Sequence, residues 1–214
     1  MSSRTRGKGS GLVPTPRREL QSAEGILEVA TELFYRQGYD ATSMQDIAAA
    51  AKINKSSLYH HIRGKEEILE AICRRAFDTL NASLRQAESS DTGAGQRVIV
   101  AFTGAVRTAL ADPRGTSIIV RLQGKSEVSQ RVKGWRRDYE QRFAELIGVA
   151  QESGDVRADV AALMLARLVL GLVDWVVEWF EPRGASYSVS SVEAAVVAVA
   201  AYGLAGEGGH LRAD

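Results

Sequence analysis

Two short helical segments joined by a tight turn are encoded in residues 42–69, TSMQDIAAAAKINKSSLYHHIRGKEEIL. Ser43 and Asp46 have the spacing of a capping box, which predicts the start of the first helix, and Asn54 is a favourable N-cap for a second helix over residues 55–62. The outward side of the second segment is expected to present Lys55, Ser56, Ser57, Tyr59 and His60. This length pattern is typical of a helix-turn-helix, whose second helix enters the major groove of DNA, although helical hairpins also serve purely structural roles.

The rest of the chain shows helical periodicity. Apolar residues recur at three- and four-residue spacing, as on one face of a helix, and no strand-period runs separated by hairpin turns occur. The predicted helices cover residues 19–37, 44–51, 55–62, 65–88, 98–110, 127–152, 159–180 and 192–204, with a short segment at 117–122. Asp159 is the predicted N-cap of its helix. We predict an all-α protein of about nine helices.

Charge is distributed unevenly along the chain. Lys and Arg number 27 against 26 Asp and Glu, so the net charge of +1 indicates no class of partner. Residues 1–65 nevertheless hold ten basic and six acidic side chains, and the remainder is mildly acidic. A basic N-terminal third suggests a surface that faces a polyanion, although a solvated tail with ordinary surface lysines would give the same count.

The last predicted helix is apolar around its whole circumference from Ala194 to Ala201. A helix of this kind has to be covered on all sides. In a chain of 214 residues, one side can meet the protein's own core, and the other side needs a second subunit. We therefore predict a homodimer in which the two C-terminal helices of each chain form a bundle, with complete burial inside the monomer as the alternative.

Three segments of this chain resemble the DNA-binding domain of TetR-type (tetracycline-repressor-like) transcription regulators. They are TSMQDIA at 42–48, AKINKSSLYHHI at 51–62 and KEEIL at 65–69. The resemblance covers about residues 20 to 70, and the run LYHHIRGKEEIL at 58–69 makes it specific. It implies an N-terminal three-helix DNA-binding domain and a C-terminal helical domain for ligand binding and dimerisation.

The resemblance also implies roles for single residues. Thr42, at the entry to the second helix, and Lys65, at the start of the fourth, would contact phosphates, and the positive end of the helix dipole would assist Lys65. The residues expected to contact bases or the DNA backbone from the recognition helix are Lys55, Ser56, Ser57, Tyr59 and His60. Leu58, His61 and Ile62 are expected to pack inward.

Two positions depart from the family pattern. Lys52 stands in the turn where the family usually has Gly, so a left-handed backbone there would cost about 1 kcal/mol, while the lysine ammonium would add a phosphate contact. Ile62 stands where the family usually has Phe, which makes a smaller plug between the helices. Neither departure changes the predicted fold.

The C-terminal helices are expected to enclose a pocket for a small, partly apolar effector. The candidate effector-binding residues are Phe102, Arg121, Trp135, Tyr139, Phe143, Asp174, Trp175 and Glu178. The aromatic residues among them either line the pocket or fill the core. Asp174 interrupts an apolar stripe, so it either contacts the ligand or forms a salt bridge with an arginine such as Arg167 or Arg121.

A second resemblance concerns the effector. Residues 171–182, GLVDWVVEWFEP, are similar to the C-terminal portion of TetR-type regulators that sense acyl-CoA thioesters. Those proteins often carry a basic residue between the two tryptophans, whereas this chain has Glu178, which would repel a CoA phosphate. An acyl-CoA thioester is therefore one candidate effector beside other partly apolar molecules.

The sequence contains no pattern typical of an enzyme or a metal site. His60 and His61 are adjacent and point about 100° apart on a helix, so they cannot share one metal ion. The single cysteine, Cys73, is typical of a reduced intracellular protein, and the longest uncharged apolar stretch, 194–206, is too short to cross a membrane. We expect no catalytic residue, metal, cofactor or membrane contact, and a cytoplasmic location.

These predictions combine into a homodimeric repressor. The predicted domains are a disordered basic arm at 1–18, a helix-turn-helix domain at 19–64, an effector-binding and dimerisation domain at 65–205 and a flexible tail at 206–214. The dimer would hold a roughly palindromic operator in double-stranded DNA until a small effector releases it. The alternatives are a helical interaction protein that does not bind DNA and an enzyme that uses the C-terminal pocket.

Overall fold

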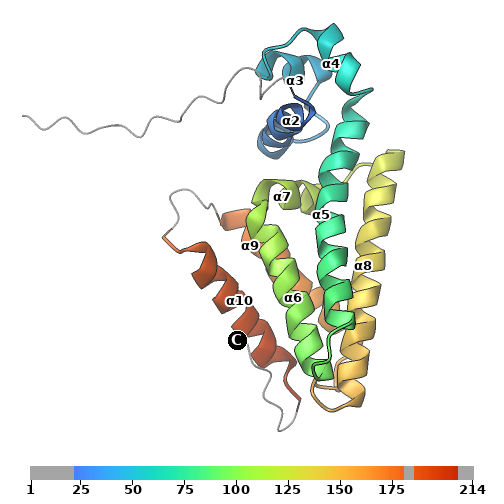
Figure 1. Cartoon of the computed structure of the whole chain (residues 1–214), viewed down its shortest axis with the longest axis vertical. Helices are drawn as coiled ribbons and strands as arrows, with labels where there is room; N and C mark the ends of the chain where they lie inside the picture. The colour runs from blue at the N-terminus through green and yellow to red at the C-terminus, as the bar shows by residue number, and fades with distance from the viewer. Residues whose placement is uncertain (1–21, 181–185, 207–214) are drawn as a thin grey trace, which may run out of the picture.

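The computed structural model describes residues 22–180 and 186–206. Its helices are α2 (Ala23–Gln37), α3 (Met44–Ala50), α4 (Lys55–His61), α5 (Lys65–Glu88), α6 (Ala94–Ala111), α7 (Pro113–Arg121), α8 (Glu127–Glu152), α9 (Ala162–Trp179) and α10 (Val189–Leu204). Helices α2 to α4 form an N-terminal unit above the bundle of the later helices, and α5 runs from one into the other (Figure 1). The described residues contain a single β-type pairing, the isolated bridge between Val156 and Ala205, so the all-α prediction is confirmed.

Side-chain caps begin the helices of the N-terminal unit. Ser43 accepts a hydrogen bond from the Asp46 amide at 3.1 Å, and the Asp46 carboxylate accepts one from the Ser43 amide at 2.8 Å, which completes the predicted capping box. Asn54 accepts a hydrogen bond from the Ser57 amide at 2.7 Å and caps α4, as predicted. The apolar residues buried at the centre of the unit are Ile26, Ala30, Phe34, Ile47 and Leu58.

Several predicted helix boundaries are wrong, for local reasons; the helix predicted at 19–37 begins at Ala23, because Ser22 caps it. Asp159 does not cap α9, because its carboxylate pairs with Arg157 at 2.7 Å, and α9 begins at Ala162 without a side-chain cap. Helix α10 begins at Val189, three residues earlier than predicted, because Ser188 caps it. The segment predicted at 117–122 is the longer helix α7, which Asp112 caps and Pro113 begins. Proline is favoured at a first helical position, where no amide donor is needed.

Parts of the predicted organisation lie outside the described residues. They are the arm predicted at 1–18 and most of the tail predicted at 206–214. In the part of the chain that the structure does describe, no helix combines the length and apolar character needed to cross a bilayer.

Helices α9 and α10 expose apolar side chains on their outer sides. On α9, Leu168 and Trp175 are 61% and 67% exposed, and on α10 Val199 and Tyr202 are 60% and 82% exposed. The opposite face of α10 is buried in its own chain through residues such as Leu204. The alternative of complete burial inside the monomer is therefore wrong, because only one side of α10 is covered.

Candidate nucleic-acid interface and effector cavity

Helix α4 presents most of its predicted DNA-contacting side chains to solvent. Lys55, Ser56, Tyr59 and His60 are exposed, and Ser57 is half-buried. The helix contains no acidic residue, and the Lys55 ammonium lies 6.0 Å from the centroid of the Tyr59 ring. Leu58 and Ile62 are buried, as predicted, so α4 keeps an apolar face on the core and a cationic, polar face in solvent.

His61 differs from its prediction. It is exposed rather than packed inward, because α4 ends at this residue and its neighbour Ile62 occupies the inward direction. His60 and His61 thus both lie on the open side of the helix-turn-helix. In the described ranges, no cluster of His, Cys, Asp or Glu side chains could hold a metal ion.

Thr42 and Lys65 take part in the turn between α2 and α3. Thr42 is 1% exposed, and its hydroxyl donates to the Gly38 carbonyl at 2.8 Å, so the structure does not support the predicted phosphate contact of this side chain. The Lys65 ammonium donates to the carbonyls of Tyr39 at 2.8 Å and Asp40 at 3.3 Å. Lys65 therefore ties the start of α5 to this turn, and its phosphate contact stays a prediction.

Lys52 adopts the backbone conformation that the family pattern suggested. Its φ of 57° lies in the left-handed region, where it is the one non-glycine residue of the described chain with positive φ. The turn between α3 and α4 thus demands a conformation that favours glycine. The Lys52 side chain is exposed, so its ammonium is available to a phosphate.

An internal cavity lies among α5, α6, α7, α8 and α9. It has a volume of about 70 Å³, and its wall is mostly apolar, with contributions from Phe77, Leu80, Ile119 and Leu170. Two of the eight candidate effector residues, Tyr139 and Asp174, line it. The polar residues of the wall are Thr108, Thr116, Arg136, Tyr139, Glu140 and Asp174.

The other six candidates lie elsewhere, for different reasons. Phe102 and Phe143 are fully buried in the core outside the cavity wall. Trp135 packs against Phe77 with ring centroids 5.9 Å apart, so it supports the wall from behind. Trp175 is 67% exposed on the outer side of α9, turned away from the cavity.

Arg121 and Glu178 bind each other instead of lining the cavity. The Arg121 guanidinium donates to both Glu178 carboxylate oxygens, at 3.0 and 2.6 Å, and Ser117 donates to the same carboxylate at 3.3 Å. These hydrogen bonds, chiefly from Arg121, hold the pKa of Glu178 below its ordinary value. The pair joins α7 to α9.

Asp174 forms a salt bridge, but with neither predicted partner. The Arg136 guanidinium donates to the Asp174 carboxylate at 2.5 Å and to Glu140 at 3.1 Å, while Arg167 donates to Glu140 at 3.2 Å and Arg121 is held by Glu178. Arg136 reaches Asp174 because α8 and α9 pack side by side. Burial raises the pKa of the Asp174 carboxyl, although Arg136 opposes this effect.

Sequence analysis missed Arg136, Glu140, Thr108 and Thr116 as cavity residues. Arg136 and Glu140 are four residues apart and flank Tyr139, so they lie next to the apolar stripe of α8. This spacing of opposite charges on a helix was the available signal, but the same spacing is common on solvated helix faces.

Helix α7 connects the cavity to the N-terminal unit. One side of α7 contributes Thr116, Ile119 and Val120 to the cavity wall, and another side packs against α2, above it in Figure 1. The Arg121 guanidinium lies 5.5 Å from the centroid of the Tyr35 ring on α2, and Arg114 pairs with Glu32 of α2 at 2.5 Å. Helix α7 therefore contacts both the cavity and the N-terminal unit.

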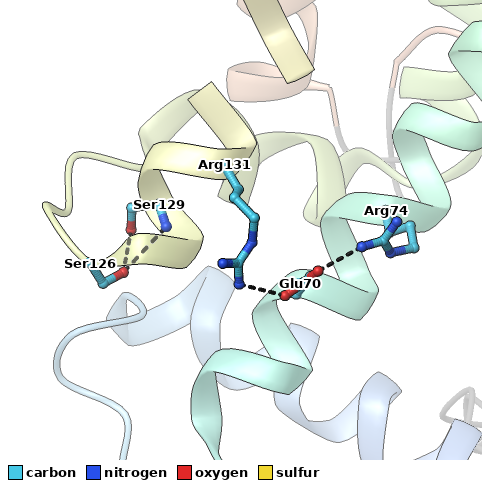
Figure 2. Close-up of polar contacts among 5 residues, drawn as sticks. All are labelled: Glu70, Arg74, Ser126, Ser129 and Arg131. Atoms are coloured by element: carbon cyan, nitrogen blue, oxygen red, sulfur yellow. Dashed lines mark hydrogen bonds and ion pairs between the residues drawn. The ribbon is translucent and has the colours of Figure 1, made fainter. Parts of the chain in front are cut away.

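A second polar connection joins α5 to α8 near the N-terminal unit. Figure 2 shows Glu70 of α5 between Arg74 of the same helix, at 2.6 Å, and Arg131 of α8, at 2.8 Å. Ser126 caps the start of α8 by accepting a hydrogen bond from the Ser129 amide at 3.3 Å (Figure 2). The hydrogen bonds from Arg74 and Arg131 lower the pKa of Glu70.

A helix-turn-helix with a cationic outer helix, linked through α5 and α7 to an internal cavity, defines a DNA-binding regulator with an effector domain. Comparison with known proteins gives the family. The family model described as "Bacterial regulatory proteins, tetR family" matches residues 26–72, and the one described as "Tetracyclin repressor-like, C-terminal domain" matches residues 92–204. The second match alone spans more than half of the chain, and the chain belongs to the tetR family.

Relatives and solved structures agree with this assignment. The HTH-type transcriptional repressor KstR2 of Rhodococcus jostii is 27% identical over 206 residues, which cover 91% of this chain and 98% of that protein. The crystal structure of SCO3833, a TetR family member from Streptomyces coelicolor A3, is 34% identical with a TM-score of 0.77, over 84% of this chain and 90% of that one. AibR in complex with isovaleryl coenzyme A and operator DNA is 26% identical with a TM-score of 0.70, over 83% and 96% of the two chains.

The comparisons confirm the predicted family, fold class and general function. The chain is a DNA-binding transcription repressor of a family whose members act as homodimers on operator DNA and bind small effectors. The domain boundaries and the single DNA-binding and effector-binding residues stay predictions.

Proposed function

We propose that α4 is the recognition helix and that its exposed Lys55, Ser56, Tyr59 and His60 contact operator DNA. The observation that carries the proposal is the combination on α4 of a buried apolar face with an outer face that lacks any acidic side chain. Lysine, serine and tyrosine side chains donate hydrogen bonds to phosphates and base edges in the major groove. The half-buried Ser57 and the exposed Lys52 flank this surface.

The two recognition helices of a dimer have to reach successive major grooves. We propose that α9 and α10 form the dimer interface, since they carry most of the large exposed apolar side chains described in the C-terminal bundle, among them Met164, Leu168, Trp175 and Tyr202. A two-fold symmetric dimer places the two α4 helices on half-sites about 34–36 Å apart. The operator is then roughly palindromic.

Effector binding in the cavity is the proposed signal for release. A ligand among α5 to α9 that displaces α7 moves the Arg121 and Arg114 contacts on α2, and α5 carries the same change through Lys65. A ligand shifts the equilibrium only by its difference in affinity for the two conformations. Coupling of this kind is typically about 1–3 kcal/mol, which is about 5- to 150-fold in operator affinity.

The test of DNA binding uses a duplex selected by the protein from a random DNA library. Fluorescence anisotropy should give an affinity whose logarithm falls linearly with the logarithm of salt concentration, with a slope of about 0.9 per phosphate contacted. Lys55→Ala combined with Tyr59→Ala should weaken binding by about 10-fold or more. Lys133→Ala combined with Tyr187→Phe, both away from α4, is the matched control and should bind as the parent does. Equal affinities of the two double variants for the selected duplex would contradict the proposal.

We propose further that the chain catalyses no reaction and acts in the cytoplasm, where bacterial operator DNA lies. The relatives are transcriptional regulators. Cys73 is buried, and this burial raises the pKa of its thiol to about 12, so it supplies no thiolate nucleophile at neutral pH. A helical interaction protein without DNA binding would give no salt-sensitive anisotropy signal in the selection above.

A further inference from the structure

The cavity wall contains one buried hydroxyl that nothing in the described chain satisfies. Tyr139 lines the cavity and is only 4% exposed, and its hydroxyl has no hydrogen-bond partner. Burial raises the pKa of this hydroxyl, so it stays protonated and can donate. A buried polar group left without a partner destabilises the folded protein. A ligand oxygen that accepts this hydrogen bond removes that penalty.

The charged groups beside Tyr139 are already neutralised. Arg136 is held by Asp174 at 2.5 Å and by Glu140 at 3.1 Å, and Arg167 also binds Glu140 at 3.2 Å. The cluster thus contains two guanidinium groups and two carboxylates, so it has no excess charge for a charged ligand to neutralise. A ligand anion would have to displace Asp174 from Arg136, and a ligand cation would have to compete with Arg136.

The size of the cavity limits the group that it encloses. The cavity of about 70 Å³ is far smaller than the roughly 300–1,000 Å³ of pockets that take drug-sized ligands, so it accommodates only a small group. A five-membered carbon ring that bears one oxygen is a suitably small probe. The other wall residues near that space, such as Phe77, Leu80 and Leu170, are apolar and favour a hydrocarbon body.

We infer that the cavity binds an uncharged apolar group with one carbonyl oxygen, which accepts a hydrogen bond from the Tyr139 hydroxyl. The inference rests on the proposed function, in which this cavity is the effector site. The carbonyl belongs to a free ketone or ester, or to the acyl end of a thioester whose carrier stays outside the cavity. Carboxylates and amines of the same size are excluded by the neutralised ion cluster.

Ligand-observed NMR with the full chain tests the inference on a series matched in size. Cyclopentanone should bind with a measurable Kd, while cyclopentanecarboxylate and cyclopentylamine should bind at least about 10-fold more weakly. Tyr139→Phe should weaken the binding of cyclopentanone by about 2- to 12-fold in Kd. This fold-change corresponds to a net hydrogen-bond contribution of about 0.5–1.5 kcal/mol. The same variant should leave methylcyclopentane, which lacks the oxygen, within about two-fold of the parent. Tyr187→Phe, on an exposed tyrosine, is the control and should change none of these values.

Asp174→Asn tests the charge argument, because a purely structural role of Asp174 would not predict stronger binding of a carboxylate ligand. The substitution leaves Arg136 with one carboxylate fewer, so it should strengthen cyclopentanecarboxylate binding by about 5-fold or more. The Kd values of cyclopentanone and isovaleryl-CoA are then compared. Tighter binding of cyclopentanone indicates a free carbonyl ligand, and tighter binding of isovaleryl-CoA indicates the acyl end of a thioester. Tighter binding of the carboxylate than of the ketone by the parent protein, or equal ketone affinity in the parent and Tyr139→Phe, would overturn the inference.

Operator binding by the unliganded protein shows whether a negative result contradicts the effector inference or the proposed function. If the parent binds its selected duplex but the ligand series gives the wrong order, the effector inference fails and the regulator assignment stands. If the ketone binds in the expected order but no duplex is selected, the proposed function fails while the chemistry of the cavity stands.

Discussion

At the scale of the residue, Lys52 stores strain in the turn of the helix-turn-helix. Its φ of 57° costs a residue with a Cβ atom about 1 kcal/mol relative to glycine. We predict that Lys52→Gly raises the free energy of unfolding by up to about 1 kcal/mol, as measured by urea denaturation. Lys52→Ala retains the Cβ atom and should not stabilise the fold.

The same two variants separate strain from DNA contact. Both remove the ammonium, so an equal loss of operator affinity in both would mean that Lys52 contacts a phosphate. A stabilisation by Lys52→Ala as large as that by Lys52→Gly would contradict the strain argument.

Glu178 gives a pH prediction. Its pKa is lowered below 4.5 by the hydrogen bonds from Arg121, so the ionised carboxylate stabilises the folded state. This contribution is present above the unfolded pKa and disappears as pH falls through the lowered folded value. We predict that Glu178→Gln is less stable than the parent at pH 7, by up to about 1 kcal/mol as for exposed pairs, and that the difference shrinks as pH falls below the ordinary pKa range of glutamate.

Thermal unfolding across pH 3–7 measures the difference at Glu178. Glu152→Gln, at an exposed position at the end of α8, serves as the control and should show no such pH-dependent difference. A Glu178→Gln penalty that stayed constant down to pH 3 would mean that the carboxylate charge is not what stabilises the contact.

At the scale of the element, α4 depends on its cap and its packing because it has only seven residues. Helices this short are not stable by propensity alone. Asn54→Ala removes the hydrogen bond to the Ser57 amide and should cost about 1 kcal/mol of unfolding free energy. Asn54→Asp keeps the capping oxygen, so it should retain stability, but it adds a negative charge to the surface proposed to contact DNA.

Asn54→Ala is therefore expected to lose more stability, and Asn54→Asp is expected to lose more operator affinity. Urea denaturation should show a loss for Asn54→Ala that Asn54→Asp lacks, and fluorescence anisotropy should show the larger loss of operator affinity for Asn54→Asp. Unchanged operator affinity in Asn54→Asp would argue that the start of α4 does not approach DNA.

At the scale of the whole molecule, the proposed dimer is expected to set the operator affinity. Leu168 lies 61% exposed among other large apolar side chains on α9. We predict that Leu168→Glu gives a monomer in light scattering, because a buried unpaired charge disfavours the interface. Loss of the second half-site should then weaken operator binding by about 100-fold or more.

Val149→Glu places the same charge on an apolar residue that is 52% exposed on α8, which is not one of the two helices proposed to form the interface. It should remain a dimer with parental operator affinity. A Leu168→Glu protein that is still a dimer in light scattering would mean that the interface lies on another surface.

The sequence by itself determined the local elements of this protein. Ser43, Asp46 and Asn54 predicted their caps correctly because capping joins atoms only three residues apart, whereas the left-handed turn at Lys52 was expected from the resemblance to the family. The buried faces of α5 and α8 followed from periodicity, since a helix fixes which residues share a side. The general function followed from the resemblance of this contiguous segment to TetR-type regulators, because the helix-turn-helix pattern alone also fits a structural hairpin.

Only the tertiary structure decided which side chains meet across helices. Asp174 pairs with Arg136 rather than Arg167 or Arg121, and Trp175 points outward rather than into the cavity, because helix packing sets these contacts at separations of tens of residues. Asp159 does not cap α9 for a local reason, because its carboxylate binds Arg157, two residues earlier in the chain. Periodicity gives the inward face of each helix, but the position and the polar lining of the cavity depend on how five helices are placed against one another.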